Sequence, residues 1–211
     1  MDRDRHSRPK ALRRIGLTGG IASGKSEVSR RLAARGVPIV DADLLAREAV
    51  APGSSALAQI ADRWPQVVRN GVLDRKALGA IVFSSEEERR ALEAILHPWI
   101  REEALRRMDD WLARGAERVI YDAPLLFETG ADAHVDAVIL VAAPEEAQRE
   151  RLMRRDGLDA AQAEARIAAQ MPLAEKRRRA TFVIENDGDL ESLHRKVDAL
   201  WERITGCQKR G

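Results

Sequence analysis

The sequence has few of the features that mark secreted, membrane-spanning or nucleic-acid-binding proteins. Cys207 is its only cysteine, so no disulfide can form within the 211 residues, which fits a reducing cytoplasm. No apolar run approaches the length of a membrane span. Aromatic residues make up 4% of the chain and the formal net charge is +2, too little for a nucleic-acid surface. We therefore expect a cytoplasmic protein with no membrane or nucleic-acid partner and no obligatory protein partner.

The length and composition indicate a folded domain that contains an inserted segment. Hydrophobic residues make up 45% of the chain, mostly Ala, Leu, Ile and Val, which suffices for a core. The basic segment 1–13 is not followed by the apolar stretch of a signal peptide. We expect it to be a disordered leader, and 206–211 to be a frayed tail. The length suits one α/β domain with an insertion.

A glycine-rich segment lies between an apolar run at 15–17 and a helical pattern over 27–35 that ends at Gly36. Its pattern G-x-x-x-x-G-K-S is typical of a loop whose backbone N–H groups cradle a polyphosphate, and the flanking strand and helix are the context it requires. Lys25 is predicted to reach the β- and γ-phosphates and Ser26 to ligate Mg²⁺. The predicted ATP-binding residues here are Gly19, Gly20, Ile21, Ala22, Ser23, Gly24, Lys25, Ser26 and Glu27.

Two carboxylates follow the second predicted strand, 37–40. Asp41 and Asp43 lie where a parallel strand ends and a helix begins, which is where open α/β sheets place their ligands. Either residue can also cap the helix that follows. The two roles are compatible, and we predict a functional role for at least one of the pair.

Residues 52–116 show no strand pattern. Helices are predicted over 55–64 and 74–83, and Ser85 with Glu88 forms the capping signal of a third. That helix should stop or kink before Pro98, which suits the first turn of another. A helical insertion therefore separates the second and third strands. In a kinase this is the place for an acceptor-binding subdomain.

The remainder alternates strands and helices. Strands are predicted over 118–122, 135–142 and 181–184, and an amphipathic helix closes the chain. Asp122 ends its strand as a Walker B carboxylate does. The segment 151–179 is rich in Ala and Arg but poor in bulky apolar residues, which suits a mobile lid or a pair of solvated surface helices.

Six motifs in order resemble dephospho-coenzyme A kinases over roughly 14–205. The set is far more specific than the phosphate loop alone. The motifs are Gly16 to Ser26, Asp41-Ala42-Asp43 with Arg47, Leu96-His97-Pro98, Pro124-Leu125-Leu126-Phe127-Glu128, Arg151 to Asp156, and Ile184-Glu185-Asn186-Asp187-Gly188.

The resemblance implies ATP-dependent phosphorylation of the ribose 3′-hydroxyl of dephospho-coenzyme A, the last step of coenzyme A synthesis. It implies a P-loop NTPase-type three-layer α/β fold with a five-stranded parallel sheet, a helical insertion domain and a lid. The expected parts are a core of 14–50 and 117–205, an acceptor-binding subdomain of 51–116, and a lid of 151–179 within the core.

Roles follow for individual residues. We predict that Asp43 is the base, with Asp41 as the alternative or as a metal partner beside Ser26. Arg151 and Arg155, with Lys25, would close over ATP and stabilise charge on the transferred group. Asn186 resembles the segment that borders the adenine. The residues expected to contact the acceptor are Asp41, Arg47, Lys76, His97 and Arg101, although a lone histidine also serves as a cap or a core group.

Three features depart from the family pattern. Ala22 stands where the loop usually has glycine, and its Cβ is harmless only if its φ is negative. Glu27 stands where threonine is usual and could alter the local charge. Residues 1–13 extend beyond the usual start. None of these departures removes Lys25, Ser26 or Asp43.

Other functions fit parts of the sequence. Another P-loop kinase, for a nucleoside, gluconate or shikimate, is compatible with the loop and the aspartate pair. A regulatory GTPase would need an Asn-Lys-x-Asp motif, which is absent, and a nucleic-acid motor would need a basic face or stacking aromatics. A non-catalytic nucleotide-binding module is disfavoured because Lys25, Ser26 and both aspartates are present.

Overall fold

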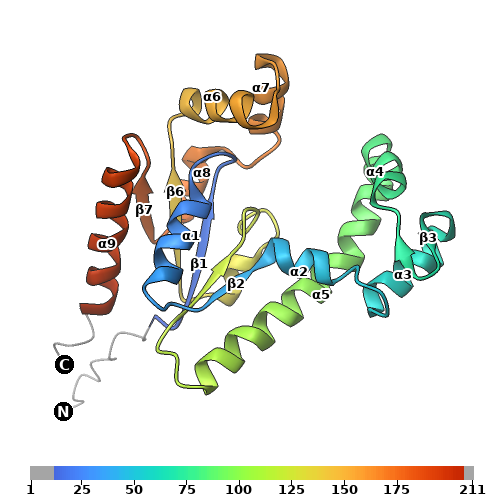
Figure 1. Ribbon diagram of the computed structural model, residues 1–211, viewed down its shortest axis with the longest axis horizontal. Helices are drawn as coiled ribbons and strands as arrows, with labels where there is room; N and C mark the ends of the chain where they lie inside the picture. The colour runs from blue at the N-terminus through green and yellow to red at the C-terminus, as the bar shows by residue number, and fades with distance from the viewer. Residues whose placement is uncertain (1–11, 207–211) are drawn as a thin grey trace, which may run out of the picture. The chain divides into compact units, whose positions relative to one another are not determined.

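The protein folds into two compact units, seen in a computed structural model that describes residues 12–206 (Figure 1). The first unit contains the described residues up to Val40 together with those from Asp110 onward, and the second contains Asp41–Asp109. The sequence placed the first boundary after residue 50, so the segment 41–50 belongs to the second unit instead. The second boundary likewise moves from residue 116 to Asp109. We describe each unit by itself.

The core of the first unit is a five-stranded sheet in the order β2-β5-β1-β6-β7. The pairs β1–β5, β1–β6 and β6–β7 are parallel, and every residue of the interior strand β6, which pairs with β1 and β7, is buried, as its continuous apolar sequence requires. The predicted fold class is confirmed. The strands are β1 (Arg14–Gly19), β2 (Ile39–Asp41), β5 (Val119–Asp122), β6 (Ala137–Ala142) and β7 (Phe182–Glu185).

Two helices pack on the same hydrophobic core as β1, β6 and β7 (Figure 1). Val28 and Leu32 of α1 and Val197 of α9 are buried there, at the helical spacing that produces one apolar stripe. Arg31 binds Asp198 across these helices with a 3.0 Å Nε–Oδ1 hydrogen bond. The helices of this unit are α1 (Lys25–Ala34), η2 (Ala131–His134), α6 (Glu145–Asp156), α7 (Ala160–Ala168), α8 (Leu173–Arg179) and α9 (Leu190–Gly206).

The second unit is mainly helical and has its own small core. Ile60, Trp64, Val67 and Leu78 are buried together, so this insertion does not depend on the sheet for its hydrophobic interior. Its elements are α2 (Ala42–Glu48), α3 (Ser55–Arg63), η1 (Pro65–Val67), β3 (Val68–Arg69), β4 (Val72–Leu73), α4 (Arg75–Ser84) and α5 (Glu86–Ala113), the last of which continues beyond Asp109.

The insertion contains a hairpin that the sequence analysis missed. Strands β3 and β4 pair antiparallel, so the prediction of no strand in 52–116 is wrong. Asn70 and Gly71 connect them with φ values of 52° and 73°. Positive φ at both positions is what a tight two-residue turn needs, and Asn-Gly is the dipeptide that provides it most readily.

The expectation that one helix stops before Pro98 and another begins there is also wrong, while the alternative of a kink at Pro98 stays a prediction. α5 runs without interruption through Pro98. Proline removes the hydrogen bond to the carbonyl four residues earlier, here that of Ala94. Both Ala94 and Pro98 are exposed, so water can satisfy that carbonyl and the helix continues.

The ends of the described chain are more ordered than the sequence suggested. The backbone N–H of Arg13 donates to Asp136 Oδ2 at 3.0 Å, and α9 extends to Gly206. The rest of the predicted leader and tail lies outside the described residues. Within 12–206, no helix is both long and apolar enough to cross a membrane.

Candidate functional site

The glycine-rich segment forms a tight loop between β1 and α1, as its sequence predicts. Ser23 N–H donates to Gly20 O at 3.0 Å, which closes the turn. Gly24 caps α1 in a left-handed conformation with φ of 92°, which a residue with a side chain rarely adopts. The first turn of α1 then begins at Lys25, so the N–H groups of Lys25 and Ser26 have no acceptor within the helix.

The loop's carbonyl groups are turned into the protein and held there. Ser23 O accepts from Asn186 Nδ2 at 2.7 Å, and Ala22 O accepts from Arg151 Nη1 at 3.2 Å. Among residues 12–206, nothing accepts a hydrogen bond from the N–H groups of Ala22 or Gly24. With its acceptors engaged and several donors unused, the loop is an anion-binding concavity at a helix N-terminus.

Lys25 and Asp122 form an ion pair beside this loop. The Lys25 ammonium contacts Asp122 Oδ1, and both side chains are largely buried. Asp122 ends β5, next to β1 in the sheet, so the two motifs meet because their strands pair. Thr18 Oγ1 further donates to Pro124 O at 3.1 Å, joining the loop's strand to the Pro124–Glu128 motif.

The two departures in the loop have different consequences. Ala22 has φ of 56°, so the condition of a negative φ is not met and its Cβ is accommodated at a cost. Glu27 is engaged by two neighbouring side chains. Its carboxylate lies 2.7 Å from His194 Nε2 and pairs with Arg30. Glu27 therefore contributes to the contact between α1 and α9, and its prediction as a nucleotide contact stays untested.

The segment predicted as a lid consists of α6, α7 and α8. Arg151 reaches the loop from α6, as described above, whereas Arg155 is bound elsewhere: its Nε donates to Asp156 Oδ1 at 2.7 Å. That guanidinium lowers the pKa of Asp156. Gln170, which lies just beyond α7, accepts a 2.7 Å hydrogen bond at Oε1 from the backbone N–H of Ile21. The structure thus brings Arg151 and Gln170, but not Arg155, to the loop.

The two aspartates of the second unit differ in their contacts: Asp41 caps a helix, whereas the Asp43 carboxylate has no hydrogen-bond partner among the described residues. Asp41 Oδ1 accepts from Asp43 N at 2.8 Å and from Leu44 N at 3.2 Å, so Asp41 is the N-cap of α2. Asp43 is exposed in the first turn, and no described side chain or backbone group binds its carboxylate. The capping alternative therefore applies to Asp41 only.

The other predicted acceptor residues lie on the surface of the same unit. Arg47 is on α2, Lys76 on α4, and His97 and Arg101 on α5. All four are exposed and, within the described chain, none has a polar partner. They supply three positively charged side chains and one imidazole, a set that suits a phosphorylated acceptor.

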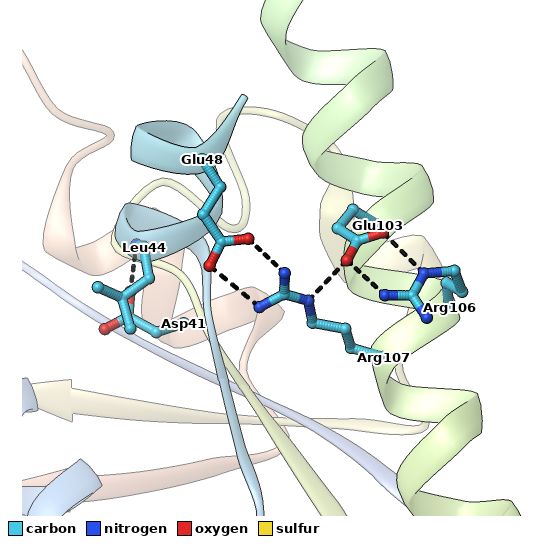
Figure 2. A network of polar contacts seen from close by, with 6 residues as sticks. All are labelled: Asp41, Leu44, Glu48, Glu103, Arg106 and Arg107. Carbon is cyan, nitrogen blue, oxygen red and sulfur yellow. Dashed lines mark hydrogen bonds and ion pairs between the residues drawn. The ribbon is translucent and has the colours of Figure 1, made fainter. Parts of the chain in front are cut away.

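A partly exposed charge network connects α2 to α5 (Figure 2). Arg107 binds Glu48 through its Nη atoms and Glu103 Oε1 through Nε at 2.7 Å. Arg106 donates to Glu103 from its other side, with 2.8 Å between Nε and Oε2. The hydrogen bonds from Arg106 and then Arg107 lower the pKa of Glu103 to about 2. The network connects the helix that carries Asp43 to the helix that carries His97.

Comparison of the chain with known proteins identifies its family. A family model described as dephospho-CoA kinase matches residues 13–192. The chain belongs to the dephospho-CoA kinase family. The family predicted from the six sequence motifs is therefore confirmed, and so is the assignment as a kinase.

Individual relatives and solved structures are similar to this chain over most of its length. The dephospho-CoA kinase of Anaeromyxobacter dehalogenans is 53% identical over 201 residues, which cover 94% of this chain and 95% of that protein. A crystal structure from Thermus thermophilus is 42% identical with a TM-score of 0.76, and covers 92% and 98% of the two chains. The structure of dephospho-CoA kinase from Campylobacter jejuni is 25% identical with a TM-score of 0.64, covering 90% and 96%.

Sequence reasoning missed the ion pair that anchors the turn after α7. Glu128 Oε1 lies 2.7 Å from the Lys176 ammonium and accepts from Met171 N at 3.1 Å. Glu128 was visible as the last residue of a dephospho-CoA kinase motif, but nothing local pointed to its partner. Lys176 lies in a run of basic residues, and its near-complete burial is a tertiary property that such a run does not reveal.

Proposed function

We propose that the protein transfers the γ-phosphoryl group of ATP to the ribose 3′-hydroxyl of dephospho-coenzyme A, releasing ADP and coenzyme A. The observation that carries the proposal is the loop whose carbonyls are tied back by Asn186 and Arg151, in a chain of the dephospho-CoA kinase family. Phosphoryl transfer relies mainly on alignment and charge stabilisation, and this loop supplies both.

The phosphates of ATP lie on the unused N–H groups of the loop and on the N-terminus of α1. The Lys25 ammonium is held by the Asp122 carboxylate beside the loop, next to the place that the β- and γ-phosphates take. Arg151 stays on the loop through Ala22 O and keeps further guanidinium donors for phosphate oxygens. Together these groups neutralise charge that develops during transfer.

Asp43 is the base that orients the 3′-hydroxyl and accepts its proton. Asp41 Oδ1 accepts from two backbone N–H groups as the cap of α2, which leaves Oδ2 for a metal, whereas the Asp43 carboxylate has no such bonds within 12–206. A carboxylate that is not already engaged can accept a proton during the reaction. Arg47, Lys76, His97 and Arg101 are the proposed contacts to the anionic acceptor.

The chain also suits Mg²⁺ as a companion of ATP. Described residues contain no group of three or more acidic, histidine or cysteine side chains that could hold a metal alone. Mg²⁺ commonly binds through one or two protein oxygens together with substrate phosphates. We assign the Ser26 hydroxyl, exposed on the first turn of α1, and a carboxylate, Asp41 in the second unit, to this role. Bound there, Mg²⁺ would neutralise charge on the phosphates.

Acceptor specificity is tested by measuring ADP release with a panel of hydroxyl compounds. Dephospho-coenzyme A, adenosine, gluconate and shikimate are each supplied with ATP and Mg²⁺, with Lys25→Ala as the inactive control. We expect turnover with dephospho-coenzyme A at least about 100-fold above the others, because the remaining acceptors lack its phosphates and pantetheine chain. Turnover with only one of the other three would refute the proposed acceptor.

A cytoplasmic location also belongs to the proposal. It is supported by the single cysteine of the sequence, Cys207, and by the family's substrate ATP. Fractionation of cells that express the chain would test it.

A further inference from the structure

Gln170 contacts the phosphate loop, although no sequence motif singled it out. Its Oε1 accepts a 2.7 Å hydrogen bond from Ile21 N–H, across 149 positions of sequence. A backbone N–H can only donate, so the oxygen of the side-chain amide must be the atom that faces it. The Nε2 group is therefore left with two N–H donors, and nothing in 12–206 accepts from them.

The turn that carries Gln170 is braced against the core of its unit. Glu128 accepts from Met171 N and pairs with Lys176, whose side chain is 1% exposed. Arg179 Nη2, at the end of α8, donates to Asp132 Oδ2 at 2.8 Å. These contacts fix the backbone of the turn, and therefore the position from which the Gln170 side chain reaches the loop. Such bracing is what a residue needs to hold a ligand in a defined position.

The position of Ile21 in the loop suggests which phosphate lies nearby. The inner phosphates of a nucleotide bind the N-terminus of the helix that follows such a loop, here at Gly24–Ser26. Ile21 lies at the opposite end of the loop, directly after Gly20. A triphosphate that extends along the loop brings its terminal phosphate to this end.

We propose that Gln170 holds the terminal phosphate of ATP. Its Oε1 stays on Ile21 N–H, and its Nε2 donates to a non-bridging oxygen of the γ-phosphate. Gln170 thereby makes the site bind a triphosphate more tightly than a diphosphate. It also connects the turn between α7 and α8 to the phosphate loop when ATP is bound. This inference rests on the proposed use of the loop for ATP.

The test compares ATP with ADP, because only ATP has the phosphate in question. Calorimetry in the absence of acceptor measures the dissociation constants of both nucleotides for the full-length protein. Gln170→Ala is expected to weaken ATP binding about tenfold and ADP binding less than twofold, as the loss of one hydrogen bond to a charged group predicts. Gln170→Glu can still accept from Ile21 N–H but has no donors and adds negative charge, so it should weaken ATP binding further.

Two controls separate this role from a structural one. Gln162→Ala removes the capping-box side chain of α7, whose Oε1 accepts from Asp159 N at 3.1 Å, and should change neither nucleotide selectively. Lys25→Ala must weaken binding of both nucleotides. If Lys25→Ala binds ATP like wild type, the proposed phosphate loop itself is refuted, and with it this inference.

The inference alone fails if Lys25→Ala behaves as expected but Gln170→Ala and Gln170→Glu change ATP and ADP binding equally. Tighter ATP binding by Gln170→Ala would also overturn it, since that result would mean that Gln170 competes with the phosphate for Ile21 N–H. Unchanged selectivity in Gln170→Glu, with thermal stability preserved, contradicts it even if Gln170→Ala folds poorly.

Discussion

The side-chain amide of Asn186 donates a 2.7 Å hydrogen bond to the carbonyl of Ser23, 163 positions earlier in the chain. Asn186 is only 6% exposed, and its own backbone N–H donates to Ala142 O at 2.7 Å. The amide is thus held at the ends of β6 and β7 and turns a loop carbonyl inward. Its position makes it a support for the shape of the phosphate loop.

Replacing Asn186 separates this support from the adenine contact that the sequence motif suggested. Asn186→Ala leaves the buried Ser23 carbonyl without its donor, which should lower the free energy of unfolding by about 1–3 kcal/mol. Binding of ATP and GTP should weaken by similar factors, because both carry the same phosphates. Calorimetry with the two nucleotides measures this, with the exposed neighbour change Asp187→Asn as control. A selective loss of ATP binding would assign Asn186 to the base instead.

Ala22 is a site where a single substitution should stabilise the protein. Its φ of 56° costs a residue with a Cβ roughly 1–2 kcal/mol, while glycine adopts this conformation freely. After the greater entropy of glycine in the unfolded chain is subtracted, Ala22→Gly should stabilise by about 0.5–1 kcal/mol. Urea unfolding compares it with Ala33→Gly in α1, which should destabilise by a similar amount. Destabilisation by both changes would contradict the account of the loop.

The network around Glu103 predicts a dependence of stability on pH. Arg106 and Arg107 hold the pKa of Glu103 at about 2, below its usual 4.5. A lowered folded-state pKa stabilises the protein above pH 4.5, and this contribution is lost as the pH falls from 4.5 towards 2.

Glu103→Gln has no charge to lose, so its stability deficit should be largest near neutral pH and shrink below pH 4.5. The lowered pKa limits the deficit to about 3 kcal/mol. Thermal unfolding at a series of pH values measures it, with the exposed neighbour change Glu102→Gln as control. A deficit that stays constant from pH 7 to pH 2.5 would show that the ion pairs do not cause it.

The division of labour between Asp43 and Asp41 can be tested by paired substitutions. Asp43→Asn should lower the turnover number about 10²- to 10⁴-fold while thermal stability and ATP affinity are unchanged, because it removes the base. Asp41→Asn weakens the N-cap of α2 and should cost at most about 1 kcal/mol of stability. Steady-state kinetics and thermal unfolding measure both. Near-wild-type turnover of Asp43→Asn would exclude it as the base.

Much of the fold could be predicted because its signals are local. The strands were marked by apolar runs, the phosphate loop by its glycines and Lys25, and the start of α5 by the capping signal of Ser85 and Glu88. The hairpin at Asn70-Gly71 was missed although its turn dipeptide was readable, since β3 and β4 are too short to show alternation. The continuity of α5 was missed because exposure, which the local pattern does not report, decides whether Pro98 ends a helix.

The site was predictable only where chemistry and sequence pattern coincide. Lys25 and Asp122 were both found, and their ion pair follows from the pairing of β1 with β5. The contact of Gln170 with Ile21 was not, because a glutamine after an alanine-rich helix has no pattern of its own. Its position depends on Glu128 and Lys176, which a local pattern cannot bring together.

The identity of the phosphorylated product tests the central claim most directly. The protein is incubated with ATP, Mg²⁺ and dephospho-coenzyme A. The products are separated and their molecular masses are measured by mass spectrometry, with Lys25→Ala as control. We predict one coenzyme A for each ADP formed, its new phosphate on the ribose 3′-oxygen and removable by a 3′-nucleotidase. ADP formed without loss of dephospho-coenzyme A, or a phosphate that the 3′-nucleotidase does not release, would contradict the account.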